Sequence, residues 1–465
     1  MLSALDFQLS AFIRILQLMP AAKLTLGKEL AYACGMVGWS IMTNLVIVVM
    51  HYFYLPPSNT GLVQLIPQLL IFNVVNILSV VDVSGRLVDA FYDPIIASLS
   101  DRSNSRKGRR IPFMKWALVP AVFFCCLIFY PPVHGVSTNN AIWLGVTMAL
   151  FFMGITTYII PYNALLPEMA ENSAEKVKLS SFQQAGFVLG IILAALVNND
   201  ADLVQHIFHV TDRITAMQYT IWSLCILAGL FMLIPILAID ERKYTASKPA
   251  HRPIMQAIRQ TFKNRNFKYY LVSDFTFYIS LSIVSSGLLY FVKVLLDQPE
   301  SIGGELMGAM VGCSLLFYPL INYLSKKIGK KPLVLIAFGM QSLVFVLIFF
   351  LGKLPMSPPA QGFLLSISTA FPLAALGILP NAILAEIAQI DAKETGENRE
   401  GMFFAVKYFF VKLGQTFGFA LFAFLTIYGI NRGHDFGLRL NGICGCILCL
   451  AALLFFSRFK EEKDK

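Results

Sequence analysis

Charged residues are scarce in this sequence. They occupy 14% of its 465 positions, whereas soluble domains average about 25%. Hydrophobic residues make up 57% of the chain, and 39 of its residues are Phe. This composition excludes an ordinary soluble globular protein and predicts a polytopic membrane protein.

The sequence also lacks several patterns that would indicate other classes of protein. Its eight cysteines do not form a disulfide framework, because most of them lie inside apolar runs, where a thiol behaves as a small hydrophobe. Their neighbours in sequence include no His or carboxylate that would complete a metal site. A phosphate-binding G-x4-G-K-[ST] loop is missing, which argues against direct ATP hydrolysis. No set of nucleophile, base and orienting group is apparent, so an enzyme is not expected.

The N-terminal stretch MLSALDFQLSAFIRILQLMP does not resemble a signal peptide. It has no basic start, and its apolar run contains Asp6 and Arg14. Its apolar residues follow helical spacing, which predicts an amphipathic segment over 1–27 on the inner membrane surface. The alternative is that translation begins at Met19.

Twelve apolar runs are long enough to cross a bilayer at roughly twenty residues each. We therefore expect an all-α membrane protein whose spans lie at about 29–55, 68–99, 112–131, 141–166, 181–199, 216–239, 269–295, 305–324, 332–352, 361–388, 402–428 and 438–457.

The loops between these runs differ in Lys and Arg, which accumulate on the cytoplasmic side. Basic residues are concentrated in the connections after the second, sixth and eighth runs and in the tail RFKEEKDK, whereas PPVHGVSTNN has none. This distribution predicts that both termini lie in the cytoplasm. The protein itself is expected in the cell membrane, which in a Gram-negative bacterium is the inner membrane. The net charge of +10 is then mainly a topology signal, so a nucleic-acid partner is not expected.

A long basic connection divides the runs into two groups of six. The predicted organisation is a first bundle at 28–239, a cytoplasmic linker at 240–267, a second bundle at 268–458 and a tail at 459–465. The segment SLSDRSNSRKGRR after the second run has a counterpart in YLSKKIGKK after the eighth. Internal repeats with a solute site between them are typical of secondary transporters.

The second run carries charges that a lipid-facing helix would not tolerate. Asp82, Arg86, Asp89 and Asp93 are spaced by 4, 3 and 4 residues, which places them along one stripe of a helix. Burying an isolated charge costs at least about 2.5–3.5 kcal/mol, so such residues are usually functional. Asp89 and Asp93, one turn apart, can direct oxygens at one Na⁺ or share one proton. The alternative is that Arg86 neutralises the acids and fixes helix packing.

A second base, Lys412, lies in the middle of the eleventh run. If it meets the stripe, three acids face two bases, and one bound Na⁺ or H⁺ would neutralise the remaining charge. Arg86, Lys412 and Asp82 are therefore predicted to balance charge around the cation.

These residues carry a family resemblance. The motif R-x2-D-A-x2-D-P at 86–94, IPYNALLPEM at 160–169 and LAEIAQIDAKETGENREGMFFA at 384–405 resemble the glycoside–pentoside–hexuronide cation symporters of the major facilitator superfamily. The resemblance implies twelve helices in two six-helix bundles and transport by alternating access. It also implies a cation site of Asp89, Asp93 and Thr156 beside Lys412. No cofactor is expected other than Na⁺ or H⁺ as the coupling ion.

The substrate side departs from the family pattern. Ser40 and Ile159 stand where sugar-specific members have acids, and Gln183 replaces a frequent arginine. Trp39 and Tyr162 are predicted to line the substrate site by stacking on a sugar ring, or else to pack helices. We therefore expect a substrate whose binding depends less on a cluster of hydroxyl groups, such as a glycoside with an apolar aglycone, a uronide or an amphiphile.

An inner gate is predicted from Asp101, Arg102, Arg109 and Arg110, although ordinary positive-inside charges would look similar. Glu168 is expected only to cap the end of its span. The predicted function is cation-coupled symport of a sugar, glycoside or uronide by a monomer in contact with membrane lipids. The alternatives are a symporter of lysolipids or other amphiphiles and a membrane sensor that does not transport.

Overall fold

The computed structural model describes residues 24–54, 64–67, 70–71, 75–103, 105, 108–170, 172–195, 197, 212–243, 254–298, 300–397, 399–426, 428–429 and 433–461. The predicted amphipathic segment at 1–27 lies almost wholly outside these residues.

The helices coincide closely with the predicted spans. In the first half they are α2 (Leu26–Asn44, continued by η1, Leu45–Val49, and α3, Met50–Tyr54), α4 (Ile77–Arg102), α5 (Ile111–Ile128), α6 (Thr138–Met169), α7 (Ser173–Ala195) and α9 (Arg213–Ala238). Along the linker lie η2 (Glu241–Lys243) and α10 (Ile254–Thr261). The second half contains α11 (Arg265–Tyr290, continued by η3, Phe291–Leu295), α12 (Glu300–Ile328), α13 (Lys330–Phe350), α14 (Pro358–Thr395), α15 (Glu400–Thr426) and α16 (Phe436–Ser457).

Eight of the described helices are apolar enough along their length to cross a membrane by composition alone. The remaining four spans, α2, α4, α11 and α15, all carry buried charged side chains: Glu29, Asp93, Asp274 and Lys407. Such side chains lower the hydropathy of a span and are tolerated where they face other helices instead of lipid.

The start of the second span differs from the prediction. The apolar run from residue 68 suggested a helix, but Leu70–Ile71 (β1) pairs antiparallel with Val75–Asn76 (β2), and α4 begins at Ile77. A short apolar run does not distinguish a strand from a helix by its periodicity.

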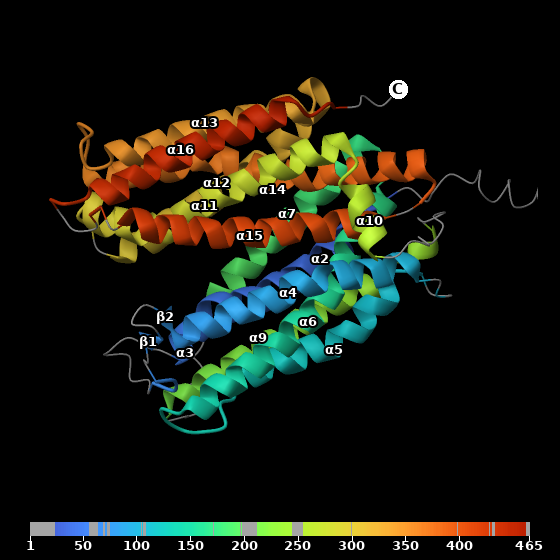
Figure 1. Cartoon of the computed structure of the whole chain (residues 1–465), viewed down its shortest axis with the longest axis horizontal. Coiled ribbons are helices and arrows are strands. Elements are labelled where there is room, and N and C mark those ends of the chain that lie inside the picture. Colours follow the sequence, from blue (N-terminus) through green and yellow to red (C-terminus); the bar gives the residue numbers. More distant parts are fainter. Residues whose placement is uncertain are drawn as a thin grey trace, which may run out of the picture.

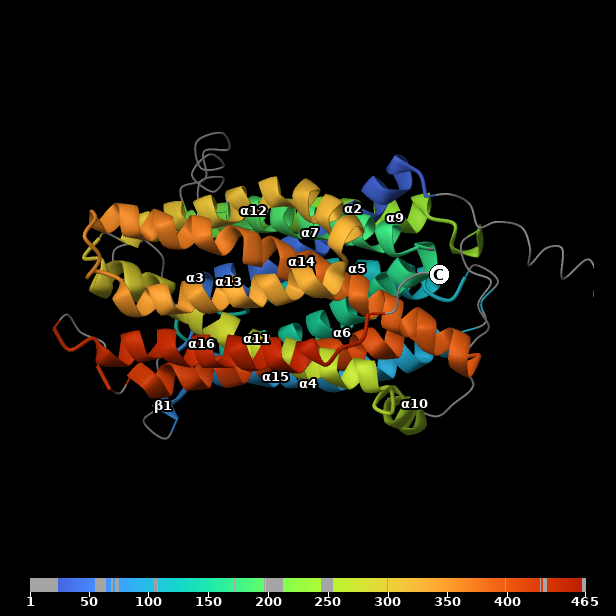
Figure 2. The same ribbon diagram turned by 90° about the horizontal axis from the view of Figure 1, so that it is seen from above.

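The helices form two bundles that lie side by side (Figure 1). One contains α2 to α9 and the other α11 to α16. Between them, α4 packs against α15, and α7 packs against α12 and α14. Figure 2 shows α7 beneath α12 and α14. This is the twelve-helix arrangement that the sequence predicts.

Glycines allow the helices of the first bundle to approach closely. A Cβ on Gly38 of α2 would lie 2.2 Å from the carbonyl oxygen of Ala228 on α9. A Cβ on Gly190 of α7 would lie 2.4 Å from the Cβ of Ser40. Only a glycine fits at either contact, so both pack α2 tightly between α7 and α9.

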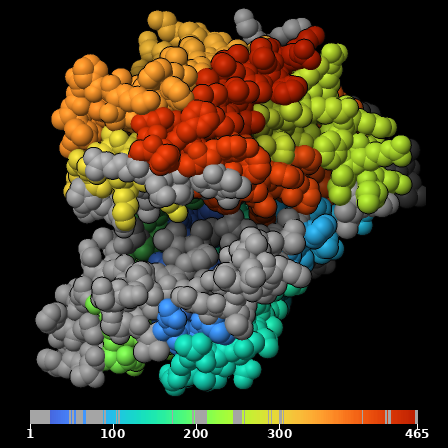
Figure 3. Space-filling model, turned by 60° about the vertical axis from the view of Figure 1, so that its left-hand side comes forward, coloured from blue at the N-terminus to red at the C-terminus, as the bar shows by residue number. Residues whose placement is uncertain are grey.

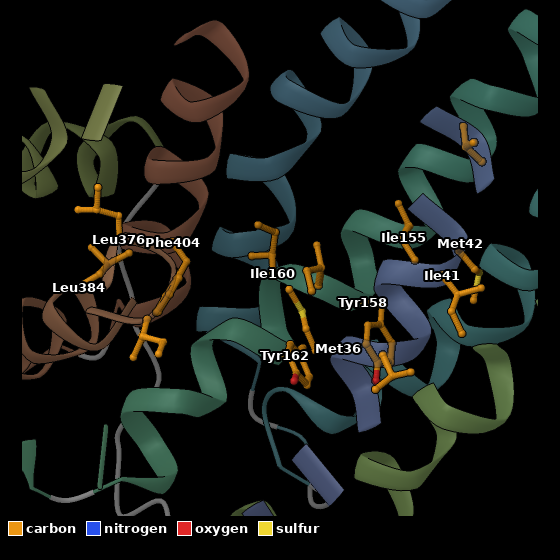
Figure 4. Close-up of a cluster of buried hydrophobic side chains, with 14 of the residues drawn as sticks. Met36, Ile41, Met42, Ile155, Tyr158, Ile160, Tyr162, Leu376, Leu384 and Phe404 are labelled. Carbon is orange, nitrogen blue, oxygen red and sulfur yellow. The ribbon is translucent and has the colours of Figure 1, made fainter. Parts of the chain in front are cut away.

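Large apolar side chains fill the remaining space. Tyr158 and Tyr162 of α6 lie against α2 around Met36, while Leu376, Leu384 and Phe404 lie on the second bundle (Figure 4). The rings of Tyr32 and Tyr162 stack with their centroids 4.3 Å apart.

Candidate ion-coupling site and gate

A buried ion pair joins the two bundles. Asp93, on α4, is 1% exposed, and its Oδ2 lies 2.7 Å from the Nζ of Lys412 on α15. Lys412 keeps 22% of its side chain exposed. The contact that the charge count requires is therefore present. Whether these residues bind a cation remains a prediction.

Of the other two predicted cation ligands, only Thr156 has a described side chain. Asp89 lies one turn before Asp93 on α4, but its side chain and those of Asp82 and Arg86 lie outside the described residues. Thr156 is buried on α6, which packs against α4. Carboxylate and hydroxyl oxygens at these positions have the chemistry that a hard cation prefers.

A chain of polar side chains also crosses between the bundles. Gln183 of α7 donates to Asn163 Oδ1 at 2.6 Å and accepts from Asn381 Nδ2 of α14 at 3.3 Å. Asn381 Oδ1 in turn accepts from the Nζ of Lys407, on α15, at 2.5 Å. Gln183 was predicted at the substrate site, and it does face the second bundle. Its partners Asn163 and Asn381, and Lys407 behind Asn381, were missed, because they come from three other spans.

The remaining predicted substrate residues pack helices in this conformation. Ser40 is fully buried, and its hydroxyl donates to the carbonyl oxygen of Phe187 at 2.6 Å. The Tyr162 hydroxyl donates to the carbonyl oxygen of Tyr32 at 2.6 Å. Ile159 is 6% exposed. Of the two readings open for Tyr162, helix packing is the one observed here.

Trp39 differs from the others in its indole nitrogen. The side chain is half-buried near Phe187, with ring centroids 6.1 Å apart, yet its Nε1 is buried without a hydrogen-bond partner in the described part of the chain. Buried polar groups are usually paired. Whether Trp39 lines the substrate site stays a prediction.

The predicted gate is centred on Arg110, which is completely buried where the linker end of the first bundle meets the second. Its guanidinium lies 2.5 Å from Asp101 Oδ1, 3.0 Å from Glu168 Oε1 and 3.4 Å from Glu400 Oε2. Arg109 lies 2.8 Å from the same Glu168 oxygen. The expectation that Glu168 only caps its span is wrong, because its carboxylate receives both arginines. The two arginines lie 59 and 58 positions before Glu168 in the sequence, so sequence spacing did not indicate this contact.

The gate contacts cross between the bundles at the start of α15. Asp101, at the end of α4, accepts hydrogen bonds from the backbone N–H groups of Gly401 at 3.2 Å and Met402 at 3.1 Å. It thus caps a helix of the opposite bundle, where carboxylates are favoured by the helix dipole. Arg102, the fourth predicted gate residue, ends α4 as an exposed side chain.

Glu241, directly after α9, holds the loop that carries the arginines. Its carboxylate accepts from the backbone N–H groups of Arg109 at 2.6 Å, Arg110 at 2.9 Å and Ile111 at 3.1 Å. Burial raises the pKa of Glu241, and so does the nearby Glu168, while the bonds from Arg110 oppose the shift.

A similar arrangement occurs in the second half. Glu461, after α16, accepts from the backbone N–H groups of Lys330 at 2.8 Å and Lys331 at 3.1 Å. The Lys330 ammonium pairs with Glu386 of α14 and donates to Ser173, at the start of α7, at 2.5 Å. Both halves therefore place a buried base of one bundle against the first turn of a helix in the other.

The opposite end of the molecule is open between the bundles. Figure 3 views the end that carries β1 and β2 and shows a hollow between the two halves. Among the described residues, the charge cluster around Arg110 thus joins the bundles at the linker end, and a hollow lies between them at the other. Two repeated bundles with a gate at one end and a hollow at the other define a secondary transporter that works by alternating access.

A family model described as MFS/sugar transport protein matches residues 31–460. The chain therefore belongs to this family of major facilitator superfamily transporters. Members of such a family are not enzymes, which confirms the expectation from the sequence.

Individual relatives are distant but cover most of the chain. An uncharacterized symporter of Synechocystis, sll1374, is 24% identical over 88% of this chain and 86% of its own. The isoprimeverose transporter of Lactiplantibacillus pentosus is 22% identical over 72% and 69%. A sodium-dependent lysophosphatidylcholine symporter of Xenopus tropicalis is 22% identical over 83% and 81%.

Among solved structures, the transporter FucP in its outward conformation superimposes with a TM-score of 0.64 at 13% identity, covering 93% of this chain and 99% of FucP. This likeness confirms the major facilitator fold.

Proposed function

We propose that this protein is a cation-coupled symporter of a sugar, glycoside or uronide in the cell membrane. The observation that carries the proposal is the buried pair of Asp93 and Lys412, since each partner comes from a different bundle. A cation that binds Asp93 together with Asp89 competes with Lys412 for the carboxylate. Cation binding therefore changes a contact between the bundles, which is what coupling an ion to alternating access requires.

The electrostatics of this exchange follow from burial. Asp93 is 1% exposed, and leaving a buried carboxylate unpaired costs several kcal/mol. Lys412 neutralises it when no cation is bound. A Na⁺ or a proton can take over this role and release the partly exposed ammonium from Asp93.

The direction of transport rests on which end lies inside. The basic linker and both termini are assigned to the cytoplasm, so the gate around Arg110 closes the inner end and the hollow opens outward. The solute would enter from outside and bind near Trp39 and the polar chain through Gln183.

The second candidate is a symporter of lysolipids or other amphiphiles. It is favoured by Ile159, an apolar residue where sugar-specific members have an acid, and by the similarity to the lysophosphatidylcholine symporter. The two candidates share the cation site and differ only in the solute.

The test is a thermal-shift screen of the purified protein against isoprimeverose, aryl glucosides, methyl glucuronide and lysophosphatidylcholine, each with and without Na⁺. A ligand that binds stabilises the native state by mass action. We expect one sugar class to raise the melting temperature further when Na⁺ is present or the pH is lowered. Stabilisation by lysophosphatidylcholine alone would establish the second candidate, and no cation dependence with any solute would contradict symport.

A further inference from the structure

The second bundle holds a buried acid that the ion-coupling site does not use. Asp274, on α11, is 5% exposed, and its Oδ2 is buried with no hydrogen-bond partner among the described residues. The hydroxyl of Tyr270, one turn earlier on the same helix, is also buried without a partner there. Helices α11 and α15 lie side by side in this bundle (Figure 1).

The base nearest to Asp274 is engaged elsewhere. Lys407 of α15 is 3% exposed and interacts with Asp274 electrostatically, but its Nζ donates to Asn381, and no ion pair within 4.0 Å joins it to Asp274 in the described part of the chain. Asn381 is held in turn by Gln183 of the first bundle. The position of the Lys407 ammonium therefore depends on a contact between the bundles.

Burial makes a charge on Asp274 costly. A carboxylate inside a protein is stable as an anion only when it is paired and hydrogen-bonded. The titratable groups around it in the described residues do not supply a close positive charge. Those that interact with it are Lys407 and Tyr408 from α15 and Tyr270 and Tyr278 from α11. From α16, Cys449 contacts Ser280, which follows Asp274 on α11.

We infer that Asp274 and Lys407 form a second ion-coupling site, which carries a proton and is separate from the pair of Asp93 and Lys412. With the inner end closed, Asp274 holds the proton and Lys407 is drawn to Asn381. When the bundles separate at the inner end, Gln183 leaves Asn381, and the Lys407 ammonium turns to Asp274. The O–H bond of the acid breaks, its proton passes to water at the inner end, and the carboxylate pairs with the ammonium. On return to the outward-open state, the Lys407 ammonium turns back to Asn381. The Asp274 carboxylate then takes a proton from water at the outer end.

This inference rests on the proposed symport but is tested without transport. Infrared difference spectra of the purified protein in lipid nanodiscs, recorded while the pH is titrated, report the carbonyl band of a protonated carboxylic acid. We expect a band that is lost in Asp274→Asn and kept in Asp93→Asn. Thr276→Val is the matched control, because it removes a buried hydroxyl of α11 that bonds only its own helix, at Val272.

A second arm tests the link to the gate. Asp101→Ala weakens the inner closure, so the protonation midpoint of Asp274 should move to lower pH as Lys407 becomes available. Adding Lys407→Gln should abolish that movement, because no ammonium remains to stabilise the carboxylate. An unchanged acid band in Asp274→Asn, or the same midpoint with the gate intact and weakened, would overturn the inference. Failure of cation-driven uptake would instead contradict the proposed function and leave this band in place.

Discussion

Removing the carboxylate of Asp101 should shift the protein towards its inward-open state. Asp101 caps the N-terminus of α15 through Gly401 and Met402, and this cap exists only while the inner end is closed. Asp101 also pairs with Arg110, but both residues belong to the first bundle. This pair is present in both states, so its loss does not change the difference in free energy between them. Loss of an N-cap costs about 0.5–2 kcal/mol, which changes an equilibrium about 2- to 30-fold.

The shift can be measured as a distance distribution between spin labels at Arg242 and Lys393, which are exposed at the inner ends of the two bundles. We expect Asp101→Ala to enlarge the long-distance population by about that factor, with Asp101→Asn intermediate because its amide oxygen still accepts a bond. The matched control is Asp212→Ala. Asp212 caps α9 within its own bundle, accepting from Thr215 N at 3.0 Å, so its loss should lower the melting temperature without moving the distances. Equal distance populations for Asp101→Ala and wild type would refute the gate.

Three further results are expected. Burial and the nearby Glu168 raise the pKa of Glu400 to about 7 in the closed gate, against the opposing charge of the arginines. Opening returns the pKa towards its ordinary value of 4.5, so the inner-closed fraction should fall as pH rises from 4.5 to about 7, and Glu400→Gln should flatten this dependence in the same distance measurement. Lys412→Ala should lower the yield of folded protein in size-exclusion chromatography, because Asp93 loses its buried partner, and adding Asp93→Asn should recover it; additive losses would show that the two side chains act independently. Gly38→Ala should destabilise the protein by about 1–3 kcal/mol, since the new methyl group meets the Ala228 carbonyl, and an unchanged thermal unfolding curve would contradict the close packing.

The spans were predictable because each needs about twenty apolar residues, and such runs are visible without any partner. The exception was the beginning of α4, where an apolar stretch forms β1 and β2 instead of another helical turn. Lys412 could be linked to the acids by counting charge, since few bases lie inside the membrane runs.

The gate and the polar chain were only partly predictable. Arg110 was apparent as a basic residue after the second span, but Glu168 and Glu400 lie 58 and 290 positions away from it. Ser40 and Tyr162 were assigned from their positions in a resembling family, yet their hydroxyls bond backbone carbonyls of neighbouring helices. Helix rotation decides whether a polar side chain meets a cavity or a helix, and sequence spacing does not specify the partner helix.

Ion-driven accumulation in proteoliposomes tests the central claim most directly. The protein is reconstituted with whichever solute the thermal-shift screen identifies, and uptake is followed with and without an inward Na⁺ gradient and an inside-alkaline pH gradient. We expect accumulation above equilibrium by the wild type and by the control variant Asp435→Asn. Asp435 pairs with Arg439 at the start of α16. Asp93→Asn should lose the accumulation while still equilibrating the solute downhill. Gradient-driven accumulation by Asp93→Asn at the wild-type level would contradict the account.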